Sequence, residues 1–353
     1  MHIQRAAILL SGVLLAAAGG QPTPRASLLV LSKHDHTLAI VDPVTLKVVA
    51  HVPVGDDPHE VAASSDGKVA YVSNYGFGAL HTLTPVDLIA QAPLPVIELG
   101  PLRAPHGLQF EGGKVWFTAE AAKVIGRYDP ATAKVDWIMG TGQNRTHMLH
   151  VWSDEKHIAT TNVNSATVTL LEKTDGPAGM PPGPPPGSTP GGPPPGMGPP
   201  HAPPGGDWNE TVVPVGRGSE GFDVSPDGNE LWVANAQDGT VSVIDVAAKK
   251  VVASLDLEVP RANRLRFTPD GKRVLISGMP AVAIVDVASR KVVKRVPVGH
   301  GGGGIQIQPD GSRAFLACGP DGSVAVLDLT TLEIVGQIDA GGNPDGLAWA
   351  VQP

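Results

Sequence analysis

Cysteine is almost absent from this chain of 353 residues, in which Cys318 is the only one. A lone cysteine excludes a disulfide framework within the chain and a CxxC zinc site. Aromatic residues make up only 4% of the sequence and charged residues 17%, whereas glycine (43 residues) and proline (35 residues) are abundant. We therefore expect Cys318 to be an inert buried thiol and the chain to contain frequent turns.

Positive charge is also scarce, since 26 lysines and arginines stand against 34 acidic residues and the net charge is −8. A phosphate backbone needs a basic face, so nucleic acid is not an expected partner. Local catalytic motifs are missing too: no GxSxG elbow is present. The segment 216–221 matches GxGxxG but leads into a strand pattern rather than a helix, which argues against dinucleotide binding.

Long hydrophobic runs are lacking except at the N-terminus, where 6–18 is apolar after Arg5 and small residues follow at 16–20. This arrangement predicts an export signal peptide over residues 1–20, and an uncleaved membrane anchor is the alternative. We expect a periplasmic or secreted mature protein that has no stable membrane insertion after cleavage. We also expect the mature protein to be a monomer.

An internal repeat is the strongest signal in the sequence. Asp-Gly turns at 66–67, 227–228, 270–271 and 310–311, with related turns at 112–113 and 154–155, recur every 40 to 46 residues with one exception. The exception is a spacing of 73 residues, and it contains the Pro/Gly-rich stretch 176–206. Without those 31 residues the period is restored, so we interpret 176–206 as a disordered loop inserted within the fourth full repeat.

Each period contains four short stretches of alternating β-branched residues bounded by Gly, Asp and Asn, which is typical of strands. Four strands every 40 residues or so describe a propeller blade. The first copy has three strands and the chain ends with one, "NPDGLAWAV". The sequence therefore predicts an all-β fold over residues 27–351: a seven-bladed β-propeller of four-stranded blades, closed by three N-terminal strands plus one C-terminal strand.

Two segments carry a resemblance to known families. "SPDGNELWVANAQDGTVSVIDVAAKKVVASL" resembles the YVTN-type seven-bladed propeller repeat, and "PHGLQFEGGKVWFTAEAAKVIGRYDPATAKV" is similar to repeats of streptogramin lyase and related propellers. The resemblance implies the fold and leaves the function open. Proteins with such repeats include secreted binding modules, lactone-cleaving enzymes, lyases and metal-centred reductases.

Candidate site residues occupy one repeated position, the second residue of each predicted innermost strand, which we call the ring position. Because innermost strands surround the propeller axis, ring positions are expected to meet at one mouth of the central channel. Imidazole and carboxylate groups suit one divalent transition metal such as zinc, copper, iron or nickel. The predicted metal ligands are His59, His106, His147 and Glu220, and the remaining ring positions are Asn263, Gly303 and Asp345.

Arginines precede four consecutive ring positions by two or three residues, at a place where they can bind a carboxylate or phosphate. The predicted ligand-binding residues are Arg103, Arg145, Arg217, Arg261, Asn263 and Asp345, together with His150 deeper in the channel. The loop 33–36 is expected to open on the same face. The competing interpretation is a hydrated channel that needs polar side chains only to satisfy water and strand ends.

Two functions remain open at this stage. The first is an exported propeller that binds a small anionic ligand or a protein partner at the channel mouth, with or without a metal. The second is a metal-assisted lyase or lactone hydrolase at the same place. Metal content of the mature protein distinguishes a metal site from a merely polar channel.

Overall fold

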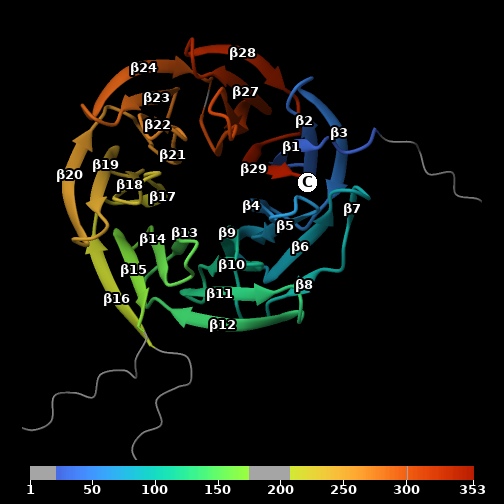
Figure 1. The fold of residues 1–353 in the computed structure, drawn as a ribbon, viewed down its shortest axis with the longest axis horizontal. Helices are drawn as coiled ribbons and strands as arrows, with labels where there is room; N and C mark the ends of the chain where they lie inside the picture. Colours follow the sequence, from blue (N-terminus) through green and yellow to red (C-terminus); the bar gives the residue numbers. More distant parts are fainter. Residues whose placement is uncertain (1–20, 175–206, 300) are drawn as a thin grey trace, which may run out of the picture.

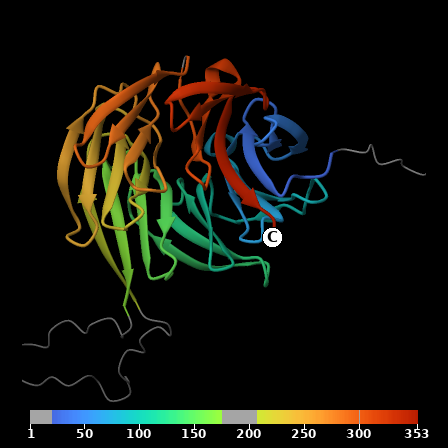
Figure 2. The ribbon, with the colours of Figure 1, turned by 45° about the horizontal axis from the view of Figure 1, so that its top comes forward.

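The computed structural model describes residues 21–174, 207–299 and 301–353, which form seven antiparallel sheets arranged around a central axis (Figure 1). The chain is a seven-bladed β-propeller. The predicted closure is confirmed, because the split blade has the order β29-β1-β2-β3. Its strands are β29 (Pro344–Val351), β1 (Ala26–Ser32), β2 (Thr37–Asp42) and β3 (Lys47–Pro53). Figure 2 shows the C-terminal strand beside the first N-terminal strands.

The other blades follow in chain order from the axis outward. The second blade has β4 (Pro58–Ala63), β5 (Val69–Asn74), β6 (Thr82–Asp87), β7 (Ala92–Pro93) and β8 (Ile97–Glu98), with the short 3-10 helix η1 (Gly76–Gly78). The third has β9 (Pro105–Glu111), β10 (Lys114–Ala119), β11 (Val124–Asp129) and β12 (Lys134–Gly140). The fourth has β13 (Thr146–Val151), β14 (His157–Asn162), β15 (Thr167–Lys173) and β16 (Trp208–Pro214).

The last three blades complete the ring. The fifth has β17 (Ser219–Val224), β18 (Glu230–Asn235), β19 (Thr240–Asp245) and β20 (Lys250–Asp256). The sixth has β21 (Leu265–Phe267), β22 (Arg273–Ile276), β23 (Ala281–Asp286) and β24 (Lys291–Pro297). The seventh has β25 (Ile305–Ile307), β26 (Arg313–Cys318), β27 (Ser323–Asp328) and β28 (Glu333–Ile338), with the 3-10 helix η2 (Gly319–Asp321).

Strand position explains strand burial. The two middle strands of each blade face neighbouring blades on both sides and are almost entirely buried, whereas an outer strand such as β20 alternates exposed and half-buried residues. In the second blade the outer strand is broken into β7 and β8. Prolines at 93 and 95 cause the break, because proline has no N–H to donate to the ladder.

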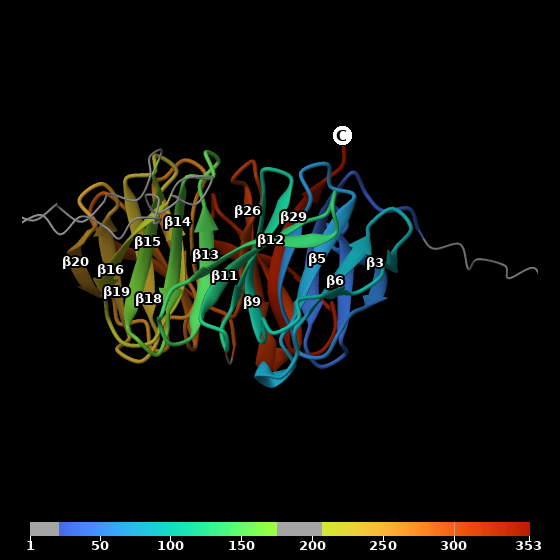
Figure 3. The same ribbon diagram turned by 90° about the horizontal axis from the view of Figure 1, so that it is seen from below.

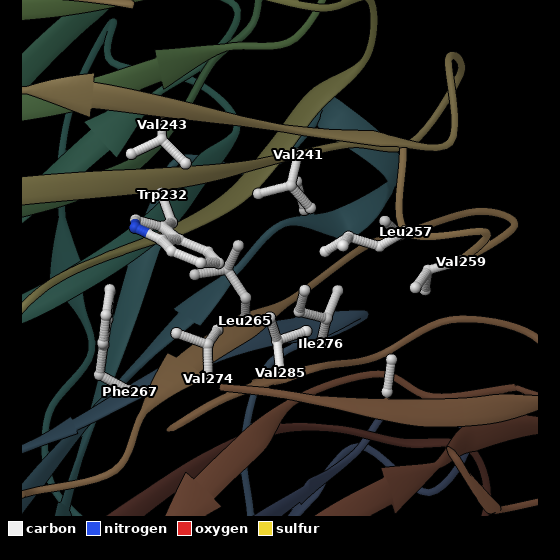
Figure 4. Close-up of a cluster of buried hydrophobic side chains, with 13 residues drawn as sticks. Trp232, Val241, Val243, Leu257, Val259, Leu265, Phe267, Val274, Ile276 and Val285 are labelled. Atoms are coloured by element: carbon white, nitrogen blue, oxygen red, sulfur yellow. The ribbon is translucent and has the colours of Figure 1, made fainter. Parts of the chain in front are cut away.

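The hydrophobic core is divided among the interfaces between blades. The described residues form seven clusters of buried side chains, one at each of the seven contacts around the ring. Between the fifth and sixth blades, Trp232 packs against Phe267, Val274 and Val285 (Figure 4). Closure thus packs each blade against a neighbour on both sides, and the unpaired edges of the inner strands face the central channel rather than the outside of the ring.

Two predicted segments lie outside the described residues, namely the signal peptide 1–20 and the inserted loop 176–206. Strand β15 ends at Lys173 and β16 begins at Trp208, so the insertion joins the third and fourth strands of its blade. That blade is the fourth along the chain. Because the first blade combines strands from both ends of the chain, it is the third blade that one continuous segment forms. In the described ranges, no helix has the length and apolar character needed to cross a membrane.

Candidate functional site

Five of the seven ring positions lie in β-bulges at the start of the inner strands, whereas Asn263 and Gly303 precede β21 and β25. In the pairing of β13 with β14, Thr146 faces Asn162 and Leu149 faces Thr160, so two residues oppose one and His147 leaves the ladder. The same shift occurs in β4, β9, β17 and β29. A bulge redirects a side chain. The bulges therefore turn His59, His106, His147, Glu220 and Asp345 away from the regular strand alternation.

Hydroxyl groups on the second strands hold these bulges in place. The Gly107 N–H donates to Thr118 Oγ1 at 2.9 Å, and Thr118 Oγ1 donates to the carbonyl of His147 in the next blade at 2.5 Å. Ser73 does the same for the carbonyl of His106 at 2.9 Å, and Thr161 for that of Glu220 at 2.7 Å. His106, His147 and Glu220 are thereby fastened by their backbone carbonyls to the preceding blade.

His106 is the most enclosed member of the site. It is 1% exposed, its Nδ1 has no hydrogen-bond partner, and its ring centroid lies 3.8 Å from that of His147 and 4.7 Å from that of His59. Burial, and the positive charge of His147 after it, hold the pKa of His106 well below its usual range. His106 is therefore neutral and has one ring nitrogen with no group to bind.

His147 is in the opposite electrostatic state. Its Nδ1 lies 2.5 Å from Oε1 of Glu120, and its Nε2 lies 2.8 Å from Oε2 of Glu220. Burial opposes a charge on the ring, but the two carboxylates outweigh it and raise the pKa of His147. Burial also opposes the charge of Glu220, and the contact with His147 outweighs that effect and lowers its pKa to about 2. This arrangement, with a carboxylate against each ring nitrogen, favours the imidazolium form of His147.

Glu120 is the functional residue that the sequence interpretation missed. It is the first residue after β10, and it also accepts a hydrogen bond of 2.6 Å from the hydroxyl of Tyr75. Lys33 and Tyr75 occupy the same place in the two preceding blades, directly after β1 and β5. Polar residues at one offset in three successive repeats were the available signal, and only the loop that begins at Lys33 was singled out.

Among the described residues, one group of at least three side chains has the spacing of a metal site. His106, Glu120 and His147 each offer a ligand atom, and these atoms lie within 4.8 Å of one another. Ligand bonds to zinc measure about 2.0–2.3 Å, so only small side-chain shifts separate this spacing from a coordinated ion. Two residues of this group, His106 and His147, belong to the predicted set of four.

His59 and Glu220, the other two predicted ligands, lie beside this group rather than in it. Nε2 of His59 lies 3.0 Å from Nζ of Lys33, which also pairs with Asp345 at 2.6 Å, and Nδ1 of His59 lies 2.9 Å from the carbonyl of Asp57. Burial and then the charge of Lys33 lower the pKa of His59. His59 is thus a neutral ring that receives a hydrogen bond from lysine, and Glu220 faces the second nitrogen of His147.

A buried arginine closes the channel below the site. Arg264, on the sixth blade, reaches across the axis to Glu60 on the second blade, with Nη2 2.8 Å from Oε1. Both side chains are nearly buried, at 11% and 13% exposure. A histidine is too short for that reach, so opposite ring positions do not share one ion. The ligand-capable residues are instead contributed by adjacent blades.

Above this floor lies a hollow of about 580 Å³, which we call the mouth hollow. Its size suits a small-molecule ligand. One wall is formed by the charged groups described above, and the opposite wall by backbone at 301–303 and 319. Eight of the predicted residues line the mouth hollow: His59, His106, Arg145, His147, Glu220, Arg261, Asn263 and Asp345.

The four predicted arginines divide into two pairs according to their offset. Arg145 and Arg261 lie two residues before a ring position, have left-handed backbone (φ 59° and 56°), and line the mouth hollow. Arg103 and Arg217 lie three residues before a ring position and do not line it. Arg103 is exposed, and Arg217 pairs with Asp238 at 2.7 Å. The left-handed turn directs the side chains two residues before a ring position toward the axis, and those three residues before it point away.

His150 is placed elsewhere as well. It lies further along β13, where its ring meets that of Trp152 edge-on at 4.7 Å between centroids, and it does not line the mouth hollow. Burial lowers its pKa. The structure therefore assembles most of the predicted ligand-binding set at the mouth and leaves Arg103, Arg217 and His150 outside it.

Comparisons with known proteins support the propeller fold and do not identify a function. No family model matches the chain, and no curated protein matches it. A crystal structure of a functionally unknown protein from Desulfotomaculum acetoxidans DSM 771 superposes with a TM-score of 0.71 at 13% identity, covering 93% of this chain and 99% of that one. The dihydro-heme d1 dehydrogenase NirN in complex with DHE superposes with a TM-score of 0.60 at 14% identity, covering 91% and 74%. The YVTN-type and streptogramin-lyase resemblances have no family model behind them.

Proposed function

We propose that this chain is an exported propeller that holds one divalent transition metal with His106, His147 and Glu120 and presents it to a small anionic ligand in the mouth hollow. The observation that carries the proposal is the buried Nδ1 of His106, which has no partner although it lies among a histidine and a carboxylate. Leaving a buried polar atom unpaired costs about 1–3 kcal/mol. An ion at this place would remove that cost.

The donor set fits a borderline metal. Two imidazoles and one carboxylate suit zinc, copper, iron or nickel, and three protein ligands leave a position free for water or a ligand. Glu220 faces the ring nitrogen of His147 opposite to Glu120 and would orient that ring, as carboxylates do behind metal-bound histidines. Arg145 and Arg261 supply positive charge on the rim.

Metal content measured by mass spectrometry on the mature protein tests this function. We expect close to one equivalent of metal in the wild type and none in the His106→Ala and Glu120→Gln variants. His150→Gln is the matched control, because His150 lies on the same inner strand as His147 but outside the group. Wild-type protein that stays metal-free after incubation with zinc, copper and nickel would refute the proposal.

A metal-assisted lyase or lactone hydrolase is the second candidate, favoured by the state of His59. This ring lines the mouth hollow beside His106 and is neutral, so it can accept a proton once Lys33 moves away from its Nε2. The ion would polarise a carbonyl of the substrate. Turnover of cyclic esters that requires metal and disappears in His59→Gln, while metal content is retained, is the expected result. Absence of turnover across such a panel would leave binding as the function.

A further inference from the structure

Arg145 contacts the carboxylate of Glu120, which belongs to the proposed metal group, and that of Glu220 beside the group. Its Nε is 3.3 Å from Oε1 of Glu120, and its Nη1 is 3.3 Å from Oε1 of Glu220. Both distances exceed the 2.7–2.9 Å of a strong charge-assisted hydrogen bond. The side chain of Arg145 is 36% exposed and lines the mouth hollow. Arg145 is thus held loosely between the site and the ligand space.

The same oxygen of Glu120 serves two cations. Oε1 accepts from Nδ1 of His147 at 2.5 Å and from Nε of Arg145 at 3.3 Å. A metal ion bound to Glu120 would compete with Arg145 for this carboxylate. It would also add positive charge next to a guanidinium that has just lost part of its counter-charge. Both effects favour the binding of an anion to the guanidinium of Arg145 in the mouth hollow.

We propose that Arg145 couples the two halves of the site: it holds Glu120 and Glu220 while no metal is bound, and it binds a small carboxylate ligand when metal takes Glu120. This inference rests on the proposed function. A guanidinium recognises a planar carboxylate with two parallel N–H groups, so the ligand class is a carboxylate rather than a bare halide. Metal and carboxylate then strengthen each other's binding by the same factor, because linkage is reciprocal.

Arg261 has a different part in this scheme. It lines the same hollow, and its Nη1 lies 3.5 Å from Sδ of Met279. No carboxylate is paired with Arg261 within the described portion of the chain. It therefore adds attraction for the anion without any tie to the metal group, and its removal should weaken carboxylate binding but keep the coupling.

Zinc affinity measured by competition with a chelating dye at fixed pH, with and without saturating acetate, tests the coupling. In the wild type we expect acetate to tighten zinc binding at least five-fold. In Arg145→Gln we expect zinc to bind at least as tightly as in wild type without acetate, because a competing cation is gone, and acetate to have no effect. A purely structural role for Arg145 would instead weaken zinc binding.

Further variants separate the explanations. Arg145→Lys keeps the charge and loses the paired N–H groups, so part of the acetate effect should remain. Arg217→Gln removes an exposed rim arginine outside the hollow and should behave as wild type. If the wild type binds none of zinc, copper and nickel, the proposed function fails and this inference with it; if it binds one of the other two metals instead of zinc, the same titration is run with that metal. If zinc binds but acetate changes nothing, or if the acetate effect survives in Arg145→Gln, only the coupling is refuted.

Discussion

His106 and His147 are neighbouring residues of one type in opposite electrostatic states. Their ring centroids lie 3.8 Å apart, but only His147 has carboxylates against its nitrogens. Burial, which is equal for the two rings, lowers the pKa of both: at His106 no carboxylate opposes it, whereas at His147 the two carboxylates outweigh it and raise the pKa. Pairs whose pKa values are driven apart in this way are typical of functional sites.

Replacing His106 by leucine should separate metal binding from stability. The unpaired Nδ1 costs the metal-free fold about 1–3 kcal/mol, so His106→Leu, which removes it, should leave the free energy of unfolding in chelator unchanged or raise it by up to about that amount. Metal binding should be lost. Urea denaturation in chelator and metal analysis measure the two quantities. A loss of several kcal/mol would mean that the imidazole itself supports the packing.

The contact between His147 and Glu220 should give stability a defined pH dependence. The pKa of His147 is raised above its ordinary 6.5, so its contribution is complete below 6.5 and is lost as pH rises through the raised value. The pKa of Glu220 is lowered from 4.5 to about 2, so its contribution is complete above 4.5 and is lost as pH falls toward 2. Both conditions hold between pH 4.5 and 6.5.

We therefore expect Glu220→Gln to be destabilising by about 2 kcal/mol in that window and by less at higher pH. Denaturation series in chelator at several pH values, on wild type and variant, measure the difference. Glu258→Gln, at an exposed position whose carboxylate is 3.8 Å from Arg295, is the control and should show no such window. A difference that grows steadily up to pH 9 would show that His147 is not charged in the folded protein.

At the scale of strands, the bulge decides which residues reach the axis. Repetition in the sequence was enough to predict that His59, His106, His147 and Glu220 occupy equivalent positions at one mouth. It did not predict Glu120, which enters the site from the end of the second strand because the bulge of the next blade brings His147 toward it. Nor did it separate Arg145 from Arg103, since that distinction depends on which residue adopts the left-handed turn.

The closing strand β29 should be indispensable. It pairs with β1 from Ala26↔Val351 to Ser32↔Pro344, and Leu347, Ala348 and Ala350 belong to the clusters on both sides of the split blade. A chain ending at residue 343 should lose cooperative thermal unfolding, because β1 is left as an unpaired inner edge. A chain ending at residue 351 is the control and should melt as wild type. A cooperative transition in the shorter chain would contradict this role.

Deleting 176–206 should leave the propeller intact. The segment is anchored at a hydrogen-bonded end of the ladder, where Thr174 N donates to Asp207 O at 2.7 Å. This end of the blade is on the face opposite the ring positions, because strands run alternately from one face to the other. We expect the melting temperature and the metal content to match those of the full chain. A fall of several degrees would show that the segment contributes packing.

For the whole molecule, a closed ring sets the distances across the axis. Figure 3 shows the blades side by side, with their strands running between the two faces of the disc. Adjacent ring positions approach within ring contact, as His59, His106 and His147 do. Across the axis, the long side chains of Arg264 and Glu60, each one residue after a ring position, meet. A metal group therefore has to come from neighbouring blades, which is where His106, Glu120 and His147 lie.

The sequence by itself determined the seven-bladed fold, its closure by β29 and the mouth at which the histidines meet. These features follow from the alternation of apolar and polar residues within each strand and from the regular spacing of the turns, and both can be read from the order of residues along the chain. Only the tertiary structure decided that Glu120 joins the histidines, that Lys33 donates a hydrogen bond to Nε2 of His59, and that Arg264 closes the channel. Those contacts join residues 14 to 204 positions apart, and their geometry depends on bulges, turns and side-chain reach that a repeat pattern does not encode.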